Sequence, residues 1–121
     1  MMYEVSLEET FCSAHSLRNY PGLCQNVHGH TFRVKVELAG EVLDGLGMLV
    51  DFVILKRTLR EILGELDHRN INDLFYFKTV NPTAENLARF IHSHIHEYFP
   101  ELLRRVTVWE SPEASASYTE P

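Results

Sequence analysis

Two runs of alternating polar and apolar residues, each with histidine at one end, constrain the fold more than any other feature. The first run covers residues 3–11 and leads to His15, and the second covers residues 31–38. His28 and His30 directly precede the second run. Alternation with a period of two predicts β-strands, and residues two apart on a strand share one face. Antiparallel pairing of these strands would bring His15 opposite the other two imidazoles. Three histidines without a fourth protein ligand leave one position open, the pattern of a catalytic zinc site.

Composition indicates one globular domain over residues 1–121. The chain is 45% hydrophobic and 23% charged, without linker, repeat or low-complexity stretch. No apolar run approaches the roughly 20 residues of a membrane helix, and no signal segment is recognisable. We therefore expect a cytoplasmic protein without a membrane partner. The formal net charge of -6 argues against a nucleic-acid partner, because nucleic-acid binding uses a basic surface.

The two cysteines differ in their expected roles. Two thiols do not make a disulfide framework. Cys12 has the opposite strand parity to His15, and we predict that it is a small buried hydrophobe. Cys24 lies among polar neighbours a short distance before His28. We therefore expect Cys24 to be the reactive thiol beside the metal.

Two helices follow the second strand in the sequence. Asp51 is a suitable N-cap for a helix from about Phe52 to Leu66, which carries apolar residues at helical spacing. Thr83 is the expected N-cap of the second helix, and Glu85 lies near the positive end of its dipole. The buried face of this helix is predicted to consist of Leu87, Phe90, Ile91, Ile95 and Tyr98.

The C-terminal part alternates again over residues 105–110, and residues 114–119 offer a return strand. Strands interrupted by a helical pair, without regular alternation of the two types, indicate an α+β fold with an antiparallel sheet.

A second group of histidines, His92, His94 and His96, repeats the two-residue spacing within the second helix. Residues two apart on a helix diverge by about 200°, so only the first and last of them share a face. We expect this face to be a solvated surface.

Two acidic positions have both a functional and a structural interpretation. Asp67 precedes His68 in a loop, and a carboxylate beside an imidazole can relay protons near neutral pH. A turn aspartate followed by a surface histidine explains the same pair equally well. Glu110 follows Trp109 at a strand end. It is either a surface group or a buried carboxylate that binds a donor-rich ligand edge.

Five motifs occur in order along almost the whole chain. They are Phe11-Cys12-Ser13-Ala14-His15, Cys24-x-x-x-His28-Gly29-His30, Leu66-Asp67-His68-x-x-Ile71-Asn72-Asp73, Asn81-Pro82-Thr83-Ala84-Glu85-Asn86-Leu87-Ala88 and Val106-Thr107-Val108-Trp109-Glu110-Ser111. Together they resemble the 6-pyruvoyl-tetrahydropterin synthase / 6-carboxytetrahydropterin synthase family. The resemblance implies a tunnelling fold, with a four-stranded antiparallel sheet and two helices packed on one face. It also implies a homohexamer of two stacked trimers with active sites between subunits.

The resemblance also implies three groups of site residues. The zinc ligands, with one Zn2+ per subunit, would be His15, His28 and His30. The catalytic residues would be Cys24 as general base, with Asp67 and His68 as a proton relay. The substrate-binding residues would be Glu110, which anchors the pterin ring, and Thr83 and Glu85, which frame its pocket.

The activity implied by the resemblance is that of a zinc-dependent lyase acting on 7,8-dihydroneopterin triphosphate. One branch of the family releases acetaldehyde and triphosphate, and leaves 6-carboxy-5,6,7,8-tetrahydropterin for queuosine and deazapurine synthesis. The short chain and the three-residue gap before His28 resemble this branch. The alternative product is 6-pyruvoyl-tetrahydropterin, in a tetrahydrobiopterin-type pathway. Gln25-Asn26 and Ala84 depart from the family pattern, which commonly has Gly-Arg and a hydroxyl residue there.

Two other classes of function are compatible with the residues. A thiol hydrolase would use Cys24, His68 and Asp67, and would form a covalent adduct without needing zinc. A non-catalytic zinc-binding or pterin-binding protein would keep the three histidines and tolerate loss of the thiol.

Overall fold

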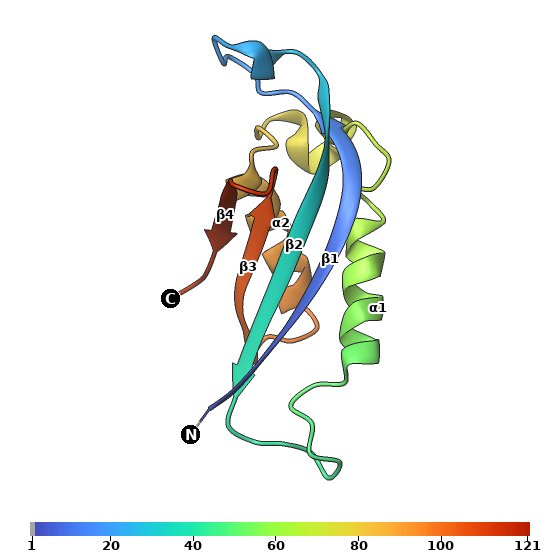
Figure 1. Cartoon of the computed structure of the whole chain (residues 1–121), viewed down its shortest axis with the longest axis vertical. Helices are drawn as coiled ribbons and strands as arrows, with labels where there is room; N and C mark the ends of the chain where they lie inside the picture. The colour runs from blue at the N-terminus through green and yellow to red at the C-terminus, as the bar shows by residue number, and fades with distance from the viewer. Residues whose placement is uncertain (1) are drawn as a thin grey trace.

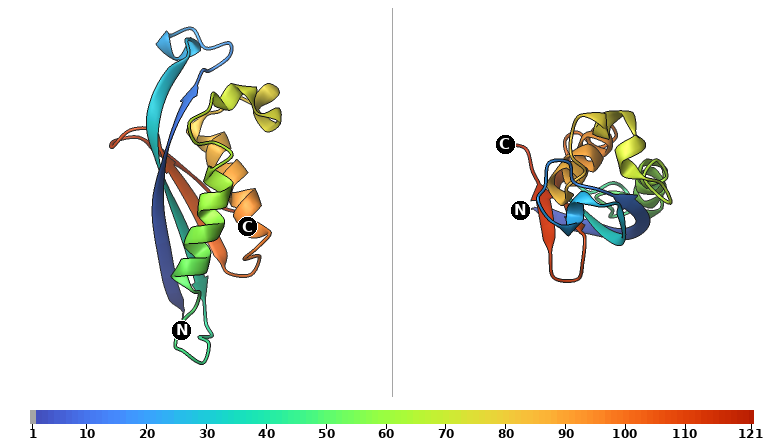
Figure 2. Two further views of the ribbon diagram at one scale, coloured as in Figure 1. Left: turned by 90° about the vertical axis from the view of Figure 1, so that its right-hand side faces the viewer. Right: turned by 90° about the horizontal axis from the view of Figure 1, so that it is seen from above.

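The computed structural model describes residues 2–121, and over this range the chain forms one four-stranded sheet and two α-helices. The strands are β1 (Tyr3–His15), β2 (His28–Gly40), β3 (Leu103–Trp109) and β4 (Ser115–Tyr118). The helices are α1 (Phe52–Leu63) and α2 (Ala84–His96). The strand order is β1-β2-β3-β4, and each neighbouring pair is antiparallel. Both helices lie on one face of the sheet (Figures 1 and 2). The predicted α+β architecture is therefore confirmed.

The core lies between the sheet and the helices. Alternate residues of β2, Phe32, Val34 and Val36, are fully buried and face α1 and α2. Leu59 of α1 and Ile91 of α2 are also fully buried. Alternation on a strand and an apolar stripe on a helix predict that these residues face the core. None of the helices over residues 2–121 is long and apolar enough to cross a membrane.

Both predicted helix starts are confirmed. The Asp51 carboxylate accepts from the backbone N–H of Val53, and the Thr83 hydroxyl accepts from that of Asn86. These caps satisfy donors that have no partner within the helix. Helix α1 ends at Leu63, three residues before the predicted end, because the chain turns there. The buried side chain of Leu66 nevertheless continues the apolar stripe.

The prediction that Cys12 is buried is wrong. Cys12 does lie on the opposite face of β1 from His15, as its parity requires, but it is exposed. The helices cover only the face that carries His15. The alternation along the strand therefore predicted correctly which face carries Cys12, but it could not predict that this face is uncovered. Tyr98 is likewise 58% exposed instead of buried, because it lies beyond the end of α2.

The predicted solvated surface on α2 is wrong for His92. This side chain is only 2% exposed. Its ring contacts the Tyr118 ring edge-on, with centroids 4.9 Å apart, and its Nδ1 lies 3.7 Å from a Glu120 carboxylate oxygen. Strand β4 packs on this side of α2 and covers it. His94 is half-buried and His96 is exposed.

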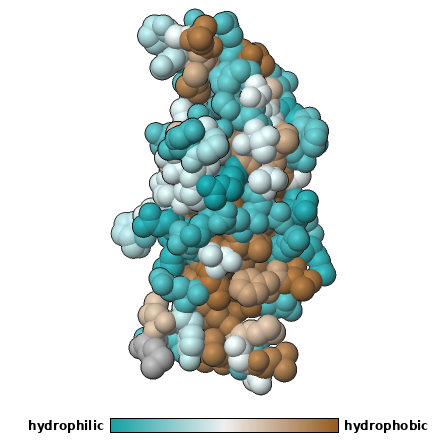
Figure 3. Space-filling view, in the orientation of Figure 1, coloured by the Kyte–Doolittle hydropathy of each residue, from teal (hydrophilic) through white to brown (hydrophobic). Residues whose placement is uncertain are grey.

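Two ends of the molecule expose distinctive loops. The loop between β1 and β2, residues 16–27, projects beyond the sheet at the top of Figure 1. At the opposite end, the loop before α1 and the first turn of α1 expose large apolar side chains: Val42, Leu46, Phe52, Val53 and Ile54. Figure 3 shows apolar surface gathered at this lower end.

Candidate metal centre and surrounding site

The register of β1 and β2 brings the three predicted ligands together. His15 pairs with His28, and Ser13 pairs with His30. The three imidazole centroids lie 4.6 to 4.9 Å apart. One ring nitrogen from each histidine lies within 4.8 Å of the others. The sequence prediction that these histidines converge from two antiparallel strands is confirmed.

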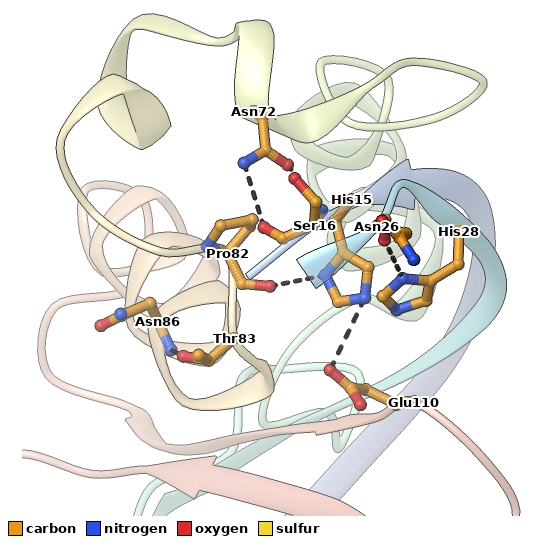
Figure 4. A network of polar contacts seen from close by, with 9 residues as sticks. All are labelled: His15, Ser16, Asn26, His28, Asn72, Pro82, Thr83, Asn86 and Glu110. Atoms are coloured by element: carbon orange, nitrogen blue, oxygen red, sulfur yellow. Dashed lines mark hydrogen bonds and ion pairs between the residues drawn. The ribbon is translucent and has the colours of Figure 1, made fainter. Parts of the chain in front are cut away.

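Backbone carbonyls set the orientation of two of these rings. Nδ1 of His15 donates to the Pro82 carbonyl at 2.7 Å, and Nδ1 of His28 donates to the Asn26 carbonyl at 2.8 Å. Because a carbonyl only accepts, a neutral imidazole in this position carries its proton on Nδ1 and its lone pair on Nε2. Figure 4 shows both contacts. A metal-binding histidine commonly uses its second nitrogen in this way.

Ring nitrogens of the cluster lie close together, and two of them are without hydrogen-bond partners among residues 2–121. Nε2 of His15 and Nε2 of His30 are buried and have no hydrogen-bond partner among residues 2–121. Buried polar atoms without partners are uncommon, since the loss of hydration is not compensated. Three imidazole nitrogens that face one another fit zinc and other divalent transition metals. The donor set therefore fits the predicted metal.

Burial also favours the form of His15 that binds metal. Only 1% of this residue is exposed. Burial lowers the pKa of His15, and the nearby imidazoles of His28 and His30 lower it further, whereas the Pro82 carbonyl and the Glu110 carboxylate act in the opposite direction. A neutral imidazole is the ligand form, since a protonated one has no free lone pair.

Glu110 lies beside the cluster, on a segment that leaves β3. One of its carboxylate oxygens is 3.9 Å from Nε2 of His15, as Figure 4 shows. The side chain is 31% exposed. Glu110 is therefore at the rim of the metal centre, where it can contact both the centre and a ligand that enters from solvent.

A cavity of about 550 Å³ opens next to Glu110. It forms where β3 stops: β2 pairs with β3 only from Arg33 onward, so the first residues of β2 have no partner on that side. His30 and Trp109 are among its lining residues. The Arg33 guanidinium stacks 3.8 Å above the Trp109 ring. The lining of the cavity thus combines an imidazole of the metal centre, an aromatic ring and the Glu110 carboxylate.

Asp67 and His68 form a hydrogen-bonded pair on the loop after α1. Nδ1 of His68 lies 2.9 Å from one carboxylate oxygen of Asp67. The other oxygen accepts from the backbone N–H of Cys12 at 2.8 Å. This backbone hydrogen bond, followed by the contact with His68, holds the pKa of Asp67 below its usual value. His68 is held at a φ of 56° while its own N–H donates to the Cys12 carbonyl.

The pair and the predicted thiol lie in different parts of the chain. His68 shares a second cavity of about 550 Å³ with Cys12 and His30. Cys24 belongs to the projecting loop, in the short turn Leu23–Gln25, where it is half-buried. The lining of the cavity beside His68 includes Cys12 and not Cys24. A single chain therefore places the pair next to the thiol that the sequence analysis assigned to the core.

The start of α2 reaches the metal centre through its backbone. Thr83 acts as the N-cap, and Glu85 is exposed in the first turn. The contact with the histidines comes from the preceding residue, since the Pro82 carbonyl accepts from His15. The predicted pocket role of Thr83 and Glu85 stays a prediction.

Two asparagines that were not predicted as site residues hold the chain just after His15. The Asn72 side chain accepts from the backbone N–H of Ser16 and donates to its carbonyl. The Asn81 side chain makes the same pair of hydrogen bonds with Arg18. Each side-chain amide thus pairs with the N–H and the C=O of one residue, as the backbone of a neighbouring strand would. Both asparagines lie in motifs that carry the family resemblance, but their partners are more than 50 residues away, so spacing did not reveal this role.

Comparison with known proteins agrees with this geometry. The family model described as 6-pyruvoyl tetrahydropterin synthase matches residues 4–121. A structure of 6-pyruvoyl tetrahydropterin synthase from Caenorhabditis elegans superposes with a TM-score of 0.92 at 30% identity, covering 100% of this chain and 97% of that one.

Two curated relatives carry different activities in their names. The 6-carboxy-5,6,7,8-tetrahydropterin synthase of a Synechocystis species is 33% identical, over 99% of this chain and 95% of the relative. The dihydroneopterin monophosphate aldolase of Pyrococcus furiosus is 38% identical, over 74% of this chain and 75% of the relative. With the fold, the histidine cluster and a family match over nearly its whole length, the chain belongs to the 6-pyruvoyl tetrahydropterin synthase family.

Proposed function

We propose that the protein is a 6-carboxy-5,6,7,8-tetrahydropterin synthase. It would convert 7,8-dihydroneopterin triphosphate to 6-carboxytetrahydropterin, and release acetaldehyde and triphosphate. The observation that carries the proposal is the convergence of three imidazole nitrogens beside a cavity rimmed by Glu110. Membership of the family supports a pterin substrate, and the Synechocystis relative supports the 6-carboxy product.

In this proposal His15, His28 and His30 hold one Zn2+ per subunit. A bound zinc ion supplies a Lewis acid that lowers the cost of deprotonating substrate hydroxyls and the carbons beside them. His15 and His28 are ready for this role, because their Nδ1 protons are already donated to carbonyls. The three side chains orient the substrate side chain over the cavity.

The remaining residues bind the ring and move protons. The Glu110 carboxylate accepts two N–H donors from the amino-pyrimidine edge of the pterin, and Thr83 and Glu85 frame the pocket. Cys24 acts as the general base. The Asp67 carboxylate fixes the His68 ring through the 2.9 Å contact at Nδ1, which leaves Nε2 to exchange protons with the substrate.

We further propose a homohexamer in which copies of the chain share active sites. Two observations support an assembly. Large apolar side chains are exposed at the end of the molecule near α1. The cavity beside the Asp67–His68 pair is lined by Cys12 and not by Cys24, so a second copy would supply the missing partner. The proposed place of the enzyme is the cytoplasm, in queuosine or deazapurine synthesis.

A second candidate activity is 6-pyruvoyl-tetrahydropterin synthesis by elimination of triphosphate. The close superposition with the Caenorhabditis elegans enzyme favours it. The identity with the Pyrococcus furiosus aldolase also makes a monophosphate substrate worth including in any assay.

The test is incubation of the zinc-loaded protein with 7,8-dihydroneopterin triphosphate and, separately, with the monophosphate. Mass analysis should show 6-carboxytetrahydropterin and acetaldehyde from the triphosphate. Formation of 6-pyruvoyl-tetrahydropterin would select the second candidate, and turnover of neither substrate would contradict both. Activity that survives a chelator, together with a covalent adduct, would indicate a thiol hydrolase instead.

The matched variant is Cys24→Ala. We expect it to bind zinc like the wild type and to lose turnover, because it removes the base and no ligand. Loss of zinc from this variant would mean that the thiol is a ligand and not the base.

A further inference from the structure

A short chain of hydrogen bonds links the metal centre to the side chain of Asn86 in α2. Nδ1 of His15 donates to the Pro82 carbonyl at 2.7 Å. The N–H of the same peptide unit, on Thr83, donates to the Asn81 carbonyl at 2.9 Å. The side-chain amide of Asn86 donates to that carbonyl as well, also at 2.9 Å. Figure 4 shows Pro82 between the His15 ring and the start of α2, where Thr83 and Asn86 lie.

These contacts fix the direction of one carbonyl. The hydrogen bond from Thr83 N–H to the Asn81 carbonyl spans three residues, so it closes a γ-type turn with Pro82 at its centre. A proline ring locks φ near the value that such a turn uses. The Pro82 carbonyl then points to His15. The second donor, from Asn86, ties the Asn81 carbonyl to the first turn of α2 and so fixes the direction of the acceptor that closes the turn.

The side chain of Asn86 is separable from the cap of the helix. Its backbone N–H is the group that the Thr83 hydroxyl accepts from, and that contact does not use the amide side chain. The amide side chain instead donates to the Asn81 carbonyl. A substitution at this position can therefore remove the support of the turn while the start of α2 stays capped.

The direction of the Pro82 carbonyl matters for the His15 ring. A neutral imidazole exists as two tautomers, and the hydrogen bond at one nitrogen selects which of them is present. While Nδ1 donates to Pro82, the buried Nε2 of His15 keeps its lone pair. If the carbonyl turns away, the proton can move to Nε2, and the ring also loses its fixed orientation.

We propose that Asn86 is a positioning residue for the metal centre: it supports the turn at Pro82, which holds His15 in the tautomer and orientation that bind a metal. The proposal rests on the proposed function only for the metal itself. The Asn86 amide donates to the Asn81 carbonyl and not to an imidazole of the cluster. It acts through two carbonyls.

The test uses Asn86→Ala and Asn86→Asp. The alanine variant removes the donor, and the aspartate variant replaces it with an acceptor of nearly the same shape. Aspartate in the first turn also suits the positive end of the helix dipole, so this variant keeps α2 stable. We expect both to lower zinc affinity by roughly tenfold, the lower end of the effect seen when groups behind a ligating histidine are removed. Zinc affinity is measured by competition with a chromophoric chelator.

A second readout separates positioning from general stability. The 15N shifts of the His15 ring in the metal-free protein should show the Nδ1–H tautomer in the wild type and a mixture in both variants. Asn86→Gln keeps an amide donor and should restore affinity and tautomer. Ser93→Ala, which removes another side-chain hydrogen bond from α2, should change neither.

Wild-type affinity and tautomer in both variants would overturn the proposal, and so would reduced affinity with an unchanged tautomer. If the wild-type protein binds no zinc, the proposed function is wrong about the metal. The tautomer measurement would still decide the positioning role, because it needs no metal.

Discussion

Two groups of histidines share one spacing in the sequence and differ completely in structure. His28 and His30 lie two apart on β2, and their rings meet with centroids 4.8 Å apart. His92 and His94 lie two apart on α2 and point to different surroundings: His92 stacks on His96, and His94 packs on Phe90. The period of the backbone, two on a strand and 3.6 on a helix, decides which rings can converge.

Burial does not distinguish the two groups. His15 and His92 are both almost fully buried, each has a ring nitrogen without a hydrogen-bond partner among residues 2–121, and burial lowers the pKa of both. The difference is what faces the free nitrogen. Nε2 of His15 faces two further imidazoles besides the Glu110 carboxylate, whereas Nδ1 of His92 faces the Glu120 carboxylate. Convergence of donors, and not burial of one histidine, marks the metal centre.

The largest expected effect separates the two groups by metal content. His28→Ala should abolish stoichiometric zinc binding, because two imidazoles alone do not make a closed structural or catalytic zinc site. His96→Ala is the matched substitution on α2 and should retain one zinc per chain. Metal analysis after gel filtration measures both. Equal loss of zinc would show that the helical histidines also bind metal.

The second prediction concerns packing. His92→Ala should lower the free energy of unfolding by about 2–3 kcal/mol, because it leaves a cavity between α2 and β4. His96→Ala, at an exposed position on the same helix, should cost less than about 0.5 kcal/mol. Urea denaturation of the metal-free proteins gives both values. A small effect at His92 would mean that β4 does not cover it in solution.

The smallest expected effect is a pH dependence of stability. In the unfolded chain His15 and His92 take up protons below about pH 6.5, whereas burial lowers their pKa values in the folded protein. The unfolded state then binds more protons, so stability of the metal-free protein should fall as pH drops below that value.

The matched variant for this prediction is His92→Phe, which removes one of the two titrating groups and keeps a ring of similar shape. Its melting temperature, measured in chelator between pH 7.5 and 5, should fall less steeply than that of the wild type. Parallel curves would show that His92 is protonated as readily in the folded chain as in the unfolded one.

Local patterns predicted much of the fold and the metal ligands. Asp51 and Thr83 start the helices as expected, since capping depends only on residues a few positions away. Alternation placed His15, His28 and His30 on one face, and antiparallel pairing brought them together. The prediction of the metal ligands succeeded because it depends only on the period of a strand and on the pairing of two strands.

Predictions failed where a distant segment decides the environment. Cys12 is exposed because the helices lie on the other face of the sheet, and His92 is buried because β4, more than 20 residues later, packs on α2. The paired hydrogen bonds of the Asn72 and Asn81 side chains join segments more than 50 residues apart. No spacing within a motif encodes such contacts. The roles of Cys24, Asp67 and Glu110 stay predictions, because they concern a substrate.

The β1–β2 register also determines which changes of chain length the site can accept. An inserted residue within β1 would turn His15 to the other face of the sheet, and one within β2 after His30 would turn His28 and His30 relative to the core residues that follow them. The loop between them behaves differently, because Asn81 holds it at Arg18 and the ladder resumes at His28. Lengthening its tip near residues 19–23 costs little, since closure entropy grows slowly with loop length. The tip can therefore diversify in length and sequence among related chains while the three nitrogens keep their geometry.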